Sequence, residues 1–124
     1  VIMSKAYDFV KHCECFYVAT MNNEFPAVRP FGAIMEVNDK IYIATHDGNE
    51  VHKQLRANGH IQIIAKKRDT REWLRITGIA EECNDIELKK RFMEECPILI
   101  KHYGEATSKH YLMFKVTASK VEFK

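Results

Sequence analysis

The end of one β-rich run and the start of the next helix combine side chains that could bind an anion. The run ends in the hydroxyl of Thr45, and a helix is predicted to begin near Asn49, with Lys53 one turn inside it. A hydroxyl, the N–H groups of a helix start and a lysine are groups that bind phosphate. Asp47 and Glu50 would repel an anion, so an ordinary solvated helix start is the alternative.

A second unusual segment is Arg29-Pro30-Phe31-Gly32, which interrupts a strong strand pattern over residues 27–37. Proline donates no ladder hydrogen bond, and glycine lets a ligand or another backbone come close. The segment therefore indicates a strand edge that faces something other than a neighbouring strand. A β-bulge that bends a barrel strand is the alternative.

The densest charge lies over residues 66–75, where basic side chains surround Trp73, the one tryptophan of the chain. This mixture of basic and aromatic residues is typical of surfaces that bind RNA or single-stranded DNA. A solvated hairpin whose charges protect a strand edge from aggregation is the alternative. Because the net charge is only +2, we favour the hairpin and expect no nucleic-acid partner.

Thiols and an imidazole cluster at His12, Cys13 and Cys15, and these groups are good ligands for a soft metal ion. A closed site needs four ligands, and the sequence does not locate the others. Reduced, buried thiols are therefore expected, and no metal site is predicted. The six histidines are scattered, with His46 closest to the possible anion site, and no Ser/His/Asp arrangement for hydrolysis is identified.

Short apolar runs separated by polar turns must position these groups. Strands are predicted over residues 16–21, 27–37 and 40–45 as an antiparallel meander, then over 60–66 and 72–81, with one bent or two short strands over 111–116 and 121–123. Helices are predicted over residues 4–14, from about 49 to 58, and from Asn84 or Asp85 until Pro97. The second helix begins with an Asp47–Glu50 capping box or with an Asn49 cap.

The pattern indicates one domain, residues 1–124, of mainly β (α+β) class, with a six- to seven-stranded antiparallel barrel and two or three flanking helices. A chain of 124 residues, 46% hydrophobic, can build one core but has little room for separate cofactor and substrate domains. No apolar run approaches the ~20 residues of a membrane span. No secretory signal pattern opens the sequence, so a cytoplasmic location is expected.

Three segments, in order, resemble the pyridoxamine 5′-phosphate oxidase-like flavoproteins. The first is Ala19-Thr20-Met21 with residues 26–32, which resembles the opening of that family. The second, residues 41–49 with Lys53, looks like its strand-to-helix phosphate segment, and the third, residues 73–80, is similar to its next long strand. The resemblance extends from about Tyr7 to Phe123.

This resemblance implies a split barrel and a homodimer that holds FMN at the subunit interface. It implies that backbone groups of Arg29, Pro30, Phe31 and Gly32 lie along the flavin ring, that Thr45, Asn49 and Lys53 hold the phosphate, and that Trp73 approaches from the partner chain. Asn49 and Glu50 depart from the small hydroxyl or basic residues common in relatives. The sequence ends at Lys124 without the extension that carries substrate residues in the vitamin B6 oxidases, so oxidation of pyridoxamine phosphate itself is not expected.

The function implied is a small FMN-dependent reductase or oxidase, with nitro compounds as candidate substrates and NAD(P)H as a candidate electron donor. Hydride or electron transfer is the chemistry of the flavin, so no catalytic side chain is identified, although Arg29 is a candidate to stabilise reduced flavin. The alternatives are a flavin-binding or stress-related split barrel without turnover, and a small barrel that binds nucleic acid through residues 66–75. A deazaflavin or a haem in the same groove is a further alternative.

Overall fold

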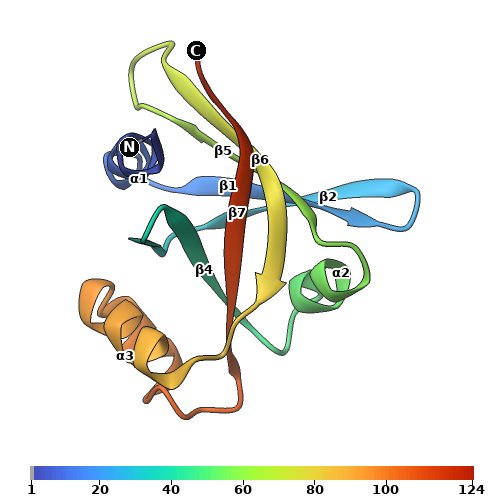
Figure 1. Ribbon diagram of the computed structural model, residues 1–124, viewed down its shortest axis with the longest axis vertical. Coiled ribbons are helices and arrows are strands. Elements are labelled where there is room, and N and C mark those ends of the chain that lie inside the picture. The colour runs from blue at the N-terminus through green and yellow to red at the C-terminus, as the bar shows by residue number, and fades with distance from the viewer. Residues whose placement is uncertain (1) are drawn as a thin grey trace.

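The structure, a computed structural model, describes residues 2–124 and contains seven strands and four helices within that range. The strands are β1 Phe16–Asn22, β2 Phe25–Phe31, β3 Ile34–Val37, β4 Lys40–His46, β5 His60–Lys66, β6 Trp73–Glu82 and β7 Tyr111–Phe123 (Figure 1). The helices are α1 Ile2–Lys11, α2 Val51–Ala57, α3 Ile86–Glu95 and α4 Ile98–Tyr103. The predicted fold class is confirmed. The helix count exceeds the predicted two or three because a second short helix, α4, starts directly after Pro97.

All seven strands belong to one curled antiparallel sheet in the order β2-β1-β5-β6-β7-β4-β3. The meander predicted for the first three runs is wrong, because residues 27–37 contribute to two strands, β2 and β3, which lie at opposite edges of the sheet. Pro30 has no N–H for a second ladder, which suits the edge position of β2. The chain therefore leaves one edge after Phe31, passes Gly32 and Ala33, and joins the other edge at Ile34.

Two groups of buried side chains form the core. The larger group fills the inside of the curled sheet, which α1 and α2 close from opposite sides (Figure 1), with Val10 and Leu55 packed against the strands. The smaller group lies between the outer face of β3, β4 and β7 and the helices α3 and α4, and it includes Phe92, Leu99 and Tyr111. Burial of these apolar side chains holds α4 against the ends of β4 and β7.

Side-chain hydrogen bonds fix where two of the helices begin. At α2 the N-cap position is Glu50, whose side chain makes no capping bond, so no Asp47–Glu50 capping box forms. The Val51 N–H donates instead to Asn49 Oδ1 at 3.2 Å, one residue before the N-cap. At α3 the Asp85 carboxylate accepts from the N–H groups of Glu87 and Leu88, which confirms Asp85 as the cap. These bonds satisfy N–H groups that have no partner inside the helix.

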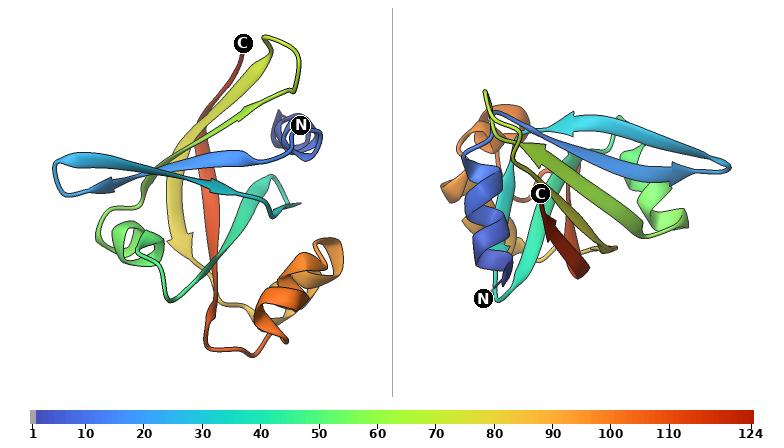
Figure 2. Two further views of the ribbon diagram at one scale, coloured as in Figure 1. Left: turned by 180° about the vertical axis from the view of Figure 1, so that it is seen from behind. Right: turned by 90° about the horizontal axis from the view of Figure 1, so that it is seen from above.

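The hairpin of β1 and β2 projects away from the rest of the molecule in both views of Figure 2. Its exposed side chains include four large apolar ones, Tyr17, Met21, Phe25 and Val28, of which Phe25 is 74% and Val28 63% exposed. By the register of the two strands, Tyr17, Met21 and Val28 lie on one face of the hairpin and Phe25 on the other. Exposed apolar side chains gathered in this way mark interaction surfaces. None of the helices between residues 2 and 124 has the length and apolar character that a membrane crossing requires.

Candidate functional site

A cavity of about 510 Å³ lies where the end of β2, the end of β4 and the helix α4 meet. Its volume is in the range of small-molecule and cofactor sites, ~300–1,000 Å³. The residues that line it are Pro30, Phe31, Gly32, Ala33, Ala44, Thr45, His46, Asn49, Ile98, Leu99, His102 and Tyr103. Five of the eight predicted site residues therefore come together here, from two segments that the fold brings to one place.

Pro30, Phe31 and Gly32 form one wall of the cavity, at the point where the chain leaves β2 and passes toward β3. No atom outside residues 31–33 lies within 4 Å of the place that a Cβ on Gly32 would occupy, so another backbone does not fill the space beside it. The bulge considered from the sequence is absent at this point, because the strand ends at Phe31. The glycine thus leaves room for a flat group to approach the backbone.

Thr45 and Asn49 form a hydrogen-bonded pair on the opposite wall. The Thr45 hydroxyl donates to Asn49 Oδ1 at 3.0 Å, and the same oxygen accepts the Val51 N–H. With its amide oxygen occupied in this way, Asn49 can present its NH₂ group as a donor. Thr45 is only 4% exposed, so its hydroxyl is held in one position by its surroundings.

Arg29 does not line the cavity, because its side chain points to the other side of β2. Its guanidinium donates to Thr20 Oγ1 at 2.8 Å, to the Val18 carbonyl at 3.2 Å and to Gln54 Oε1 at 2.7 Å. Burial lowers the pKa of Arg29 from its ordinary value. These three bonds tie β2 to β1 and to α2, and so hold in place the strand that carries Pro30 and Phe31.

Lys53 and Trp73 also lie outside the cavity. Lys53 Nζ pairs with Glu50 at 3.2 Å on the exposed face of α2. Trp73 opens β6, where the Arg75 guanidinium lies 5.3 Å from its ring centre. Arg75 in turn donates to Glu122 at 2.9 Å, which holds the pKa of that carboxyl down at about 2.

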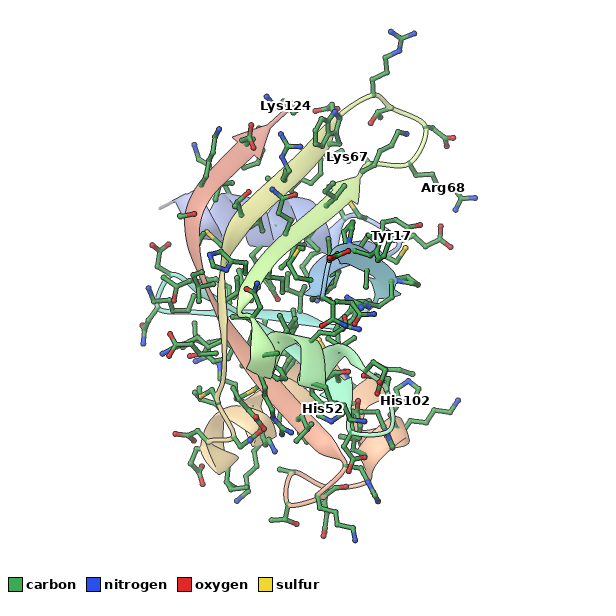
Figure 3. All side chains as sticks on the ribbon, turned by 90° about the vertical axis from the view of Figure 1, so that its right-hand side faces the viewer. Tyr17, His52, Lys67, Arg68, His102 and Lys124 are labelled. Atoms are coloured by element: carbon green, nitrogen blue, oxygen red, sulfur yellow. The ribbon has the colours of Figure 1, made fainter. Side chains whose placement is uncertain are left out.

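The basic hairpin after β5 lies far from the cavity. Figure 3 shows Lys67 and Arg68 at one end of the molecule and His102, on α4, toward the other. Part of its charge is paired, because Lys67 lies 4.0 Å from Glu72 and Arg68 lies 3.9 Å from Glu14. This is the arrangement of the solvated hairpin that the sequence favoured.

The thiols near the first helix lack the geometry of a metal site. His12 Nδ1 lies 2.7 Å from the Asp8 carbonyl, and the Cys13 thiol donates to the Phe9 carbonyl at 3.3 Å. Burial raises the pKa of Cys13, which opposes the thiolate form that metals bind. Between residues 2 and 124, the one group of three side chains close enough to share an ion lies elsewhere, at His46, Asp47 and His110.

Sequence reasoning missed the contribution of α4 and of the start of β7. Four rings stack from the core to the surface in the order Tyr111, Tyr103, His46, His110, with neighbouring ring centres 4.8, 5.9 and 5.2 Å apart. Burial raises the pKa of Tyr103. Only the pairing of β4 with β7 places His46 opposite Tyr111, and no local spacing in the sequence signals a contact across more than 60 residues.

Comparison with known proteins identifies the family and relatives of the same fold. The family model described as pyridoxamine 5′-phosphate oxidase matches residues 2–124, and no curated protein matches the chain. A NimC/NimA family protein from Clostridium acetobutylicum is 27% identical, with a TM-score of 0.84 over 98% of this chain and 89% of that one.

Two further solved structures share the fold at lower identity. General stress protein 26 from Bacillus anthracis is 14% identical, with a TM-score of 0.81 over 98% of this chain and 92% of that one. A candidate 5-nitroimidazole antibiotic-resistance protein from Bacteroides thetaiotaomicron is 16% identical, with a TM-score of 0.72 over 97% of this chain and 81% of that one. Because the family model spans all the described residues, the chain belongs to the pyridoxamine 5′-phosphate oxidase family.

Proposed function

We propose that this chain is an FMN-binding oxidoreductase that works as a homodimer. The observation that carries the proposal is the meeting of the strand break at Pro30–Gly32 with the Thr45–Asn49 pair around one cavity. These are the segments that resembled the flavin and phosphate segments of the family to which the chain belongs. The cavity has the size of a cofactor site. One wall offers open backbone and apolar surface, as a flavin ring requires, and the other offers hydrogen-bonding groups, as a phosphate requires.

The flavin ring would lie against the backbone from Pro30 to Gly32. Open space beside Gly32 allows a flat aromatic system to reach the backbone there, and Phe31 and Leu99 supply apolar surface. The role of Arg29 is to hold this wall, since its bonds to Thr20 and Gln54 fix the strand from behind. With its guanidinium on that side, Arg29 is better placed to position the strand than to touch the ring.

The phosphate would be held by the Asn49 NH₂ group and by the Thr45 hydroxyl, which would exchange its bond to Asn49 Oδ1 for one to the phosphate. Lys53 supplies a positive charge one turn along α2, although it is paired with Glu50 in this structure. Both side chains of that pair are about two-thirds exposed, and such surface pairs contribute only ~0–1 kcal/mol. A dianionic phosphate can therefore compete with Glu50 for Lys53.

The rest of the site would come from a second copy of the chain. The apolar face of the β1–β2 hairpin gives a surface for association, and Ile79 on β6, which β5 separates from β1, is also exposed. In such a dimer Trp73 of one subunit would close the flavin site of the other. Closure excludes water and strengthens the electrostatic interactions inside the site.

Bound FMN would supply transfer of a hydride or of single electrons between a donor such as NAD(P)H and a small acceptor. Nitro compounds are the acceptors to test first, because a NimC/NimA family protein and a candidate 5-nitroimidazole resistance protein share this fold. His46, His102 and Tyr103 line the cavity and can orient such an acceptor by hydrogen bonds.

The first test is the visible spectrum and mass of whatever co-purifies with the chain, followed by anaerobic mixing with NADH or NADPH in a stopped-flow instrument. We expect yellow protein that carries FMN and loses its flavin absorbance on reduction. Protein that stays colourless after FMN is added would contradict the proposal. A mass that identifies a haem or a deazaflavin would contradict the choice of cofactor but not the cavity.

A flavin-binding protein without turnover is the second candidate. It is favoured by the likeness in fold to general stress protein 26. This candidate predicts bound FMN that neither NADH nor NADPH reduces, so the same stopped-flow trace separates the two.

A further inference from the structure

We propose that His46, Asp47 and His110 form a binding site for a divalent transition metal ion, of which Zn²⁺ is the representative. The three residues supply two imidazoles and one carboxylate at the rim of the cavity. The proposal rests on this cluster alone and does not depend on a bound flavin.

The fold brings the three residues together through the pairing of two strands. His46 ends β4 and is opposite Tyr111, the first residue of β7. His110, one position before Tyr111, therefore lies close to His46 and Asp47. The Asp47 N–H donates to the His110 carbonyl at 3.1 Å, which extends the pairing by one step and fixes both segments. The imidazoles of His46 and His110 lie parallel, with ring centres 5.2 Å apart and planes 5° from each other.

The distances fit an ion that is shared by all three groups. Asp47 Oδ1 lies 2.8 Å from His110 Nδ1 and 3.4 Å from His46 Nδ1, and one ligand atom from each residue lies within 4.8 Å of the others. Zinc bonds of about 2.0–2.1 Å in a tetrahedron place neighbouring ligand atoms about 3.3 Å apart. The observed separations lie on either side of this value. Because an imidazole binds a metal in the plane of its ring, the parallel rings of His46 and His110 would turn toward each other to share the ion.

The donor set also favours a metal such as zinc over calcium or magnesium. Imidazole nitrogen suits Zn²⁺, Cu²⁺ and Ni²⁺, whereas the harder ions prefer oxygen ligands throughout. Three protein ligands leave a fourth position for water, as in zinc sites that bind a ligand. The side chains of His46 and His110 are each 50% exposed and that of Asp47 is 37% exposed, so water can reach this position.

Two hydrogen bonds must be exchanged when the ion binds. His46 Nδ1 accepts the Gly48 N–H at 2.8 Å, so its lone pair is engaged by Gly48 and this bond must break before the nitrogen binds an ion. His110 Nδ1 donates to Asp47 Oδ1, and its proton would be released to solvent when the metal takes its place. Tyr103 stacks on His46 from the other side.

The test is calorimetric titration of the untagged full-length chain, stripped with a chelator, with ZnCl₂ as the probe. We expect one Zn²⁺ per chain, and an affinity at least about tenfold lower in each of H46Q, D47N and H110Q, the size of loss expected for a damaged metal site. H60Q is the matched control, because His60 is an exposed histidine whose ring nitrogen pairs with Asn58, outside this cluster. Its affinity should equal that of the unmodified chain.

Two results would overturn the site. One is the absence of stoichiometric Zn²⁺ binding by the unmodified chain. The other is unchanged binding by H110Q together with loss of binding in C13S, which would assign the ion to the thiols instead. If a variant does not fold, as judged by circular dichroism, the imidazole resonances of the unmodified chain provide the second measurement. Zn²⁺ should then shift those of His46 and His110 and leave that of His60 in place.

Discussion

Asn49 connects local structure to the proposed function, since one side chain both begins α2 and faces the cavity. Its amide oxygen is occupied by Thr45 and by the Val51 N–H, which leaves the amide nitrogen for a ligand. The two roles can be separated because a carboxylate accepts hydrogen bonds as an amide oxygen does but donates none.

We predict that Asn49→Ala and Asn49→Asp have different effects on stability. The alanine variant loses the acceptor of the Val51 N–H and with it about 1 kcal/mol of unfolding free energy. The aspartate variant keeps that acceptor, so its unfolding free energy stays within a few tenths of a kcal/mol of the unmodified value. Both should bind FMN at least roughly tenfold more weakly, a loss of about 1.4 kcal/mol, because the donor is gone and the new carboxylate repels the phosphate. Denaturant unfolding and fluorescence titration with FMN measure the two properties. FMN affinity unchanged in Asn49→Asp would remove Asn49 from the phosphate site.

The pairing of Arg75 with Glu122 predicts a dependence of stability on pH. Arg75 lowers the pKa of Glu122 from 4.5 to about 2. The folded chain thus favours the ionised carboxylate, so the stabilisation is complete above the ordinary pKa and is lost as the pH falls through about 2. The thermal midpoint of the unmodified chain should exceed that of Glu122→Gln at pH 7, and the gap should narrow between pH 4.5 and pH 2. A gap that stays constant with pH would contradict this assignment.

The predictable part of the site consists of residues that are close to one another in the sequence as well as in space. Thr45 and Asn49 are four positions apart across one strand-to-helix turn, so the sequence already places them together. His110 and Tyr103 reach His46 only through the pairing of β4 with β7 and the packing of α4. The same applies to Arg29, whose partner Gln54 lies on a helix 25 positions away.

At the scale of elements, two glycines have different roles. One allows two strands to pack closely, and the other leaves the cavity accessible. A Cβ added at Gly78 would clash with the Thr117 carbonyl oxygen, a backbone atom, at the irregularity between β6 and β7. A Cβ added at Gly32 would meet no atom within 4 Å outside residues 31–33. The one glycine is required by the sheet and the other leaves the cavity open.

We predict that Gly78→Ala lowers the unfolding free energy by about 3 kcal/mol or prevents folding, because backbone must move to admit the methyl group. Gly32→Ala is the matched control and should change stability by less than about 1 kcal/mol. Thermal unfolding of the two variants side by side checks this. Equal stabilities of the two variants would contradict this prediction, because they would mean that β6 and β7 move apart at Gly78 without a loss of stability.

The individual strands could be predicted, but their order in the sheet could not. Alternating apolar residues mark β1, β5 and β6 to within two residues, because one face of each is buried. The separation of β2 from β3 depends on which strands pair at long range. Local patterns carry no such information, and the short spacing between the runs favoured the incorrect meander.

At the scale of the whole molecule, the apolar hairpin is the surface on which a dimer would depend. Phe25 and Val28 are among the most exposed large apolar side chains of the described residues. We predict that replacing both by lysine gives a monomer and lowers FMN affinity, because a charged side chain cannot be buried unpaired in an apolar interface. Ile100→Lys, at an exposed apolar position on α4, is the control and should leave the dimer intact. Light scattering after gel filtration measures the mass, and a monomeric unmodified chain would contradict the dimer.

The central claim is that the cavity between Pro30–Gly32 and Thr45–Asn49 binds FMN, and its most direct test is titration of the apo-chain with FMN, followed by flavin fluorescence. We expect one FMN per chain, with affinity roughly tenfold or more lower in Thr45→Val, which keeps the shape of the side chain but removes the buried hydroxyl donor. Absence of saturable binding, or binding of equal strength in Thr45→Val, would contradict it.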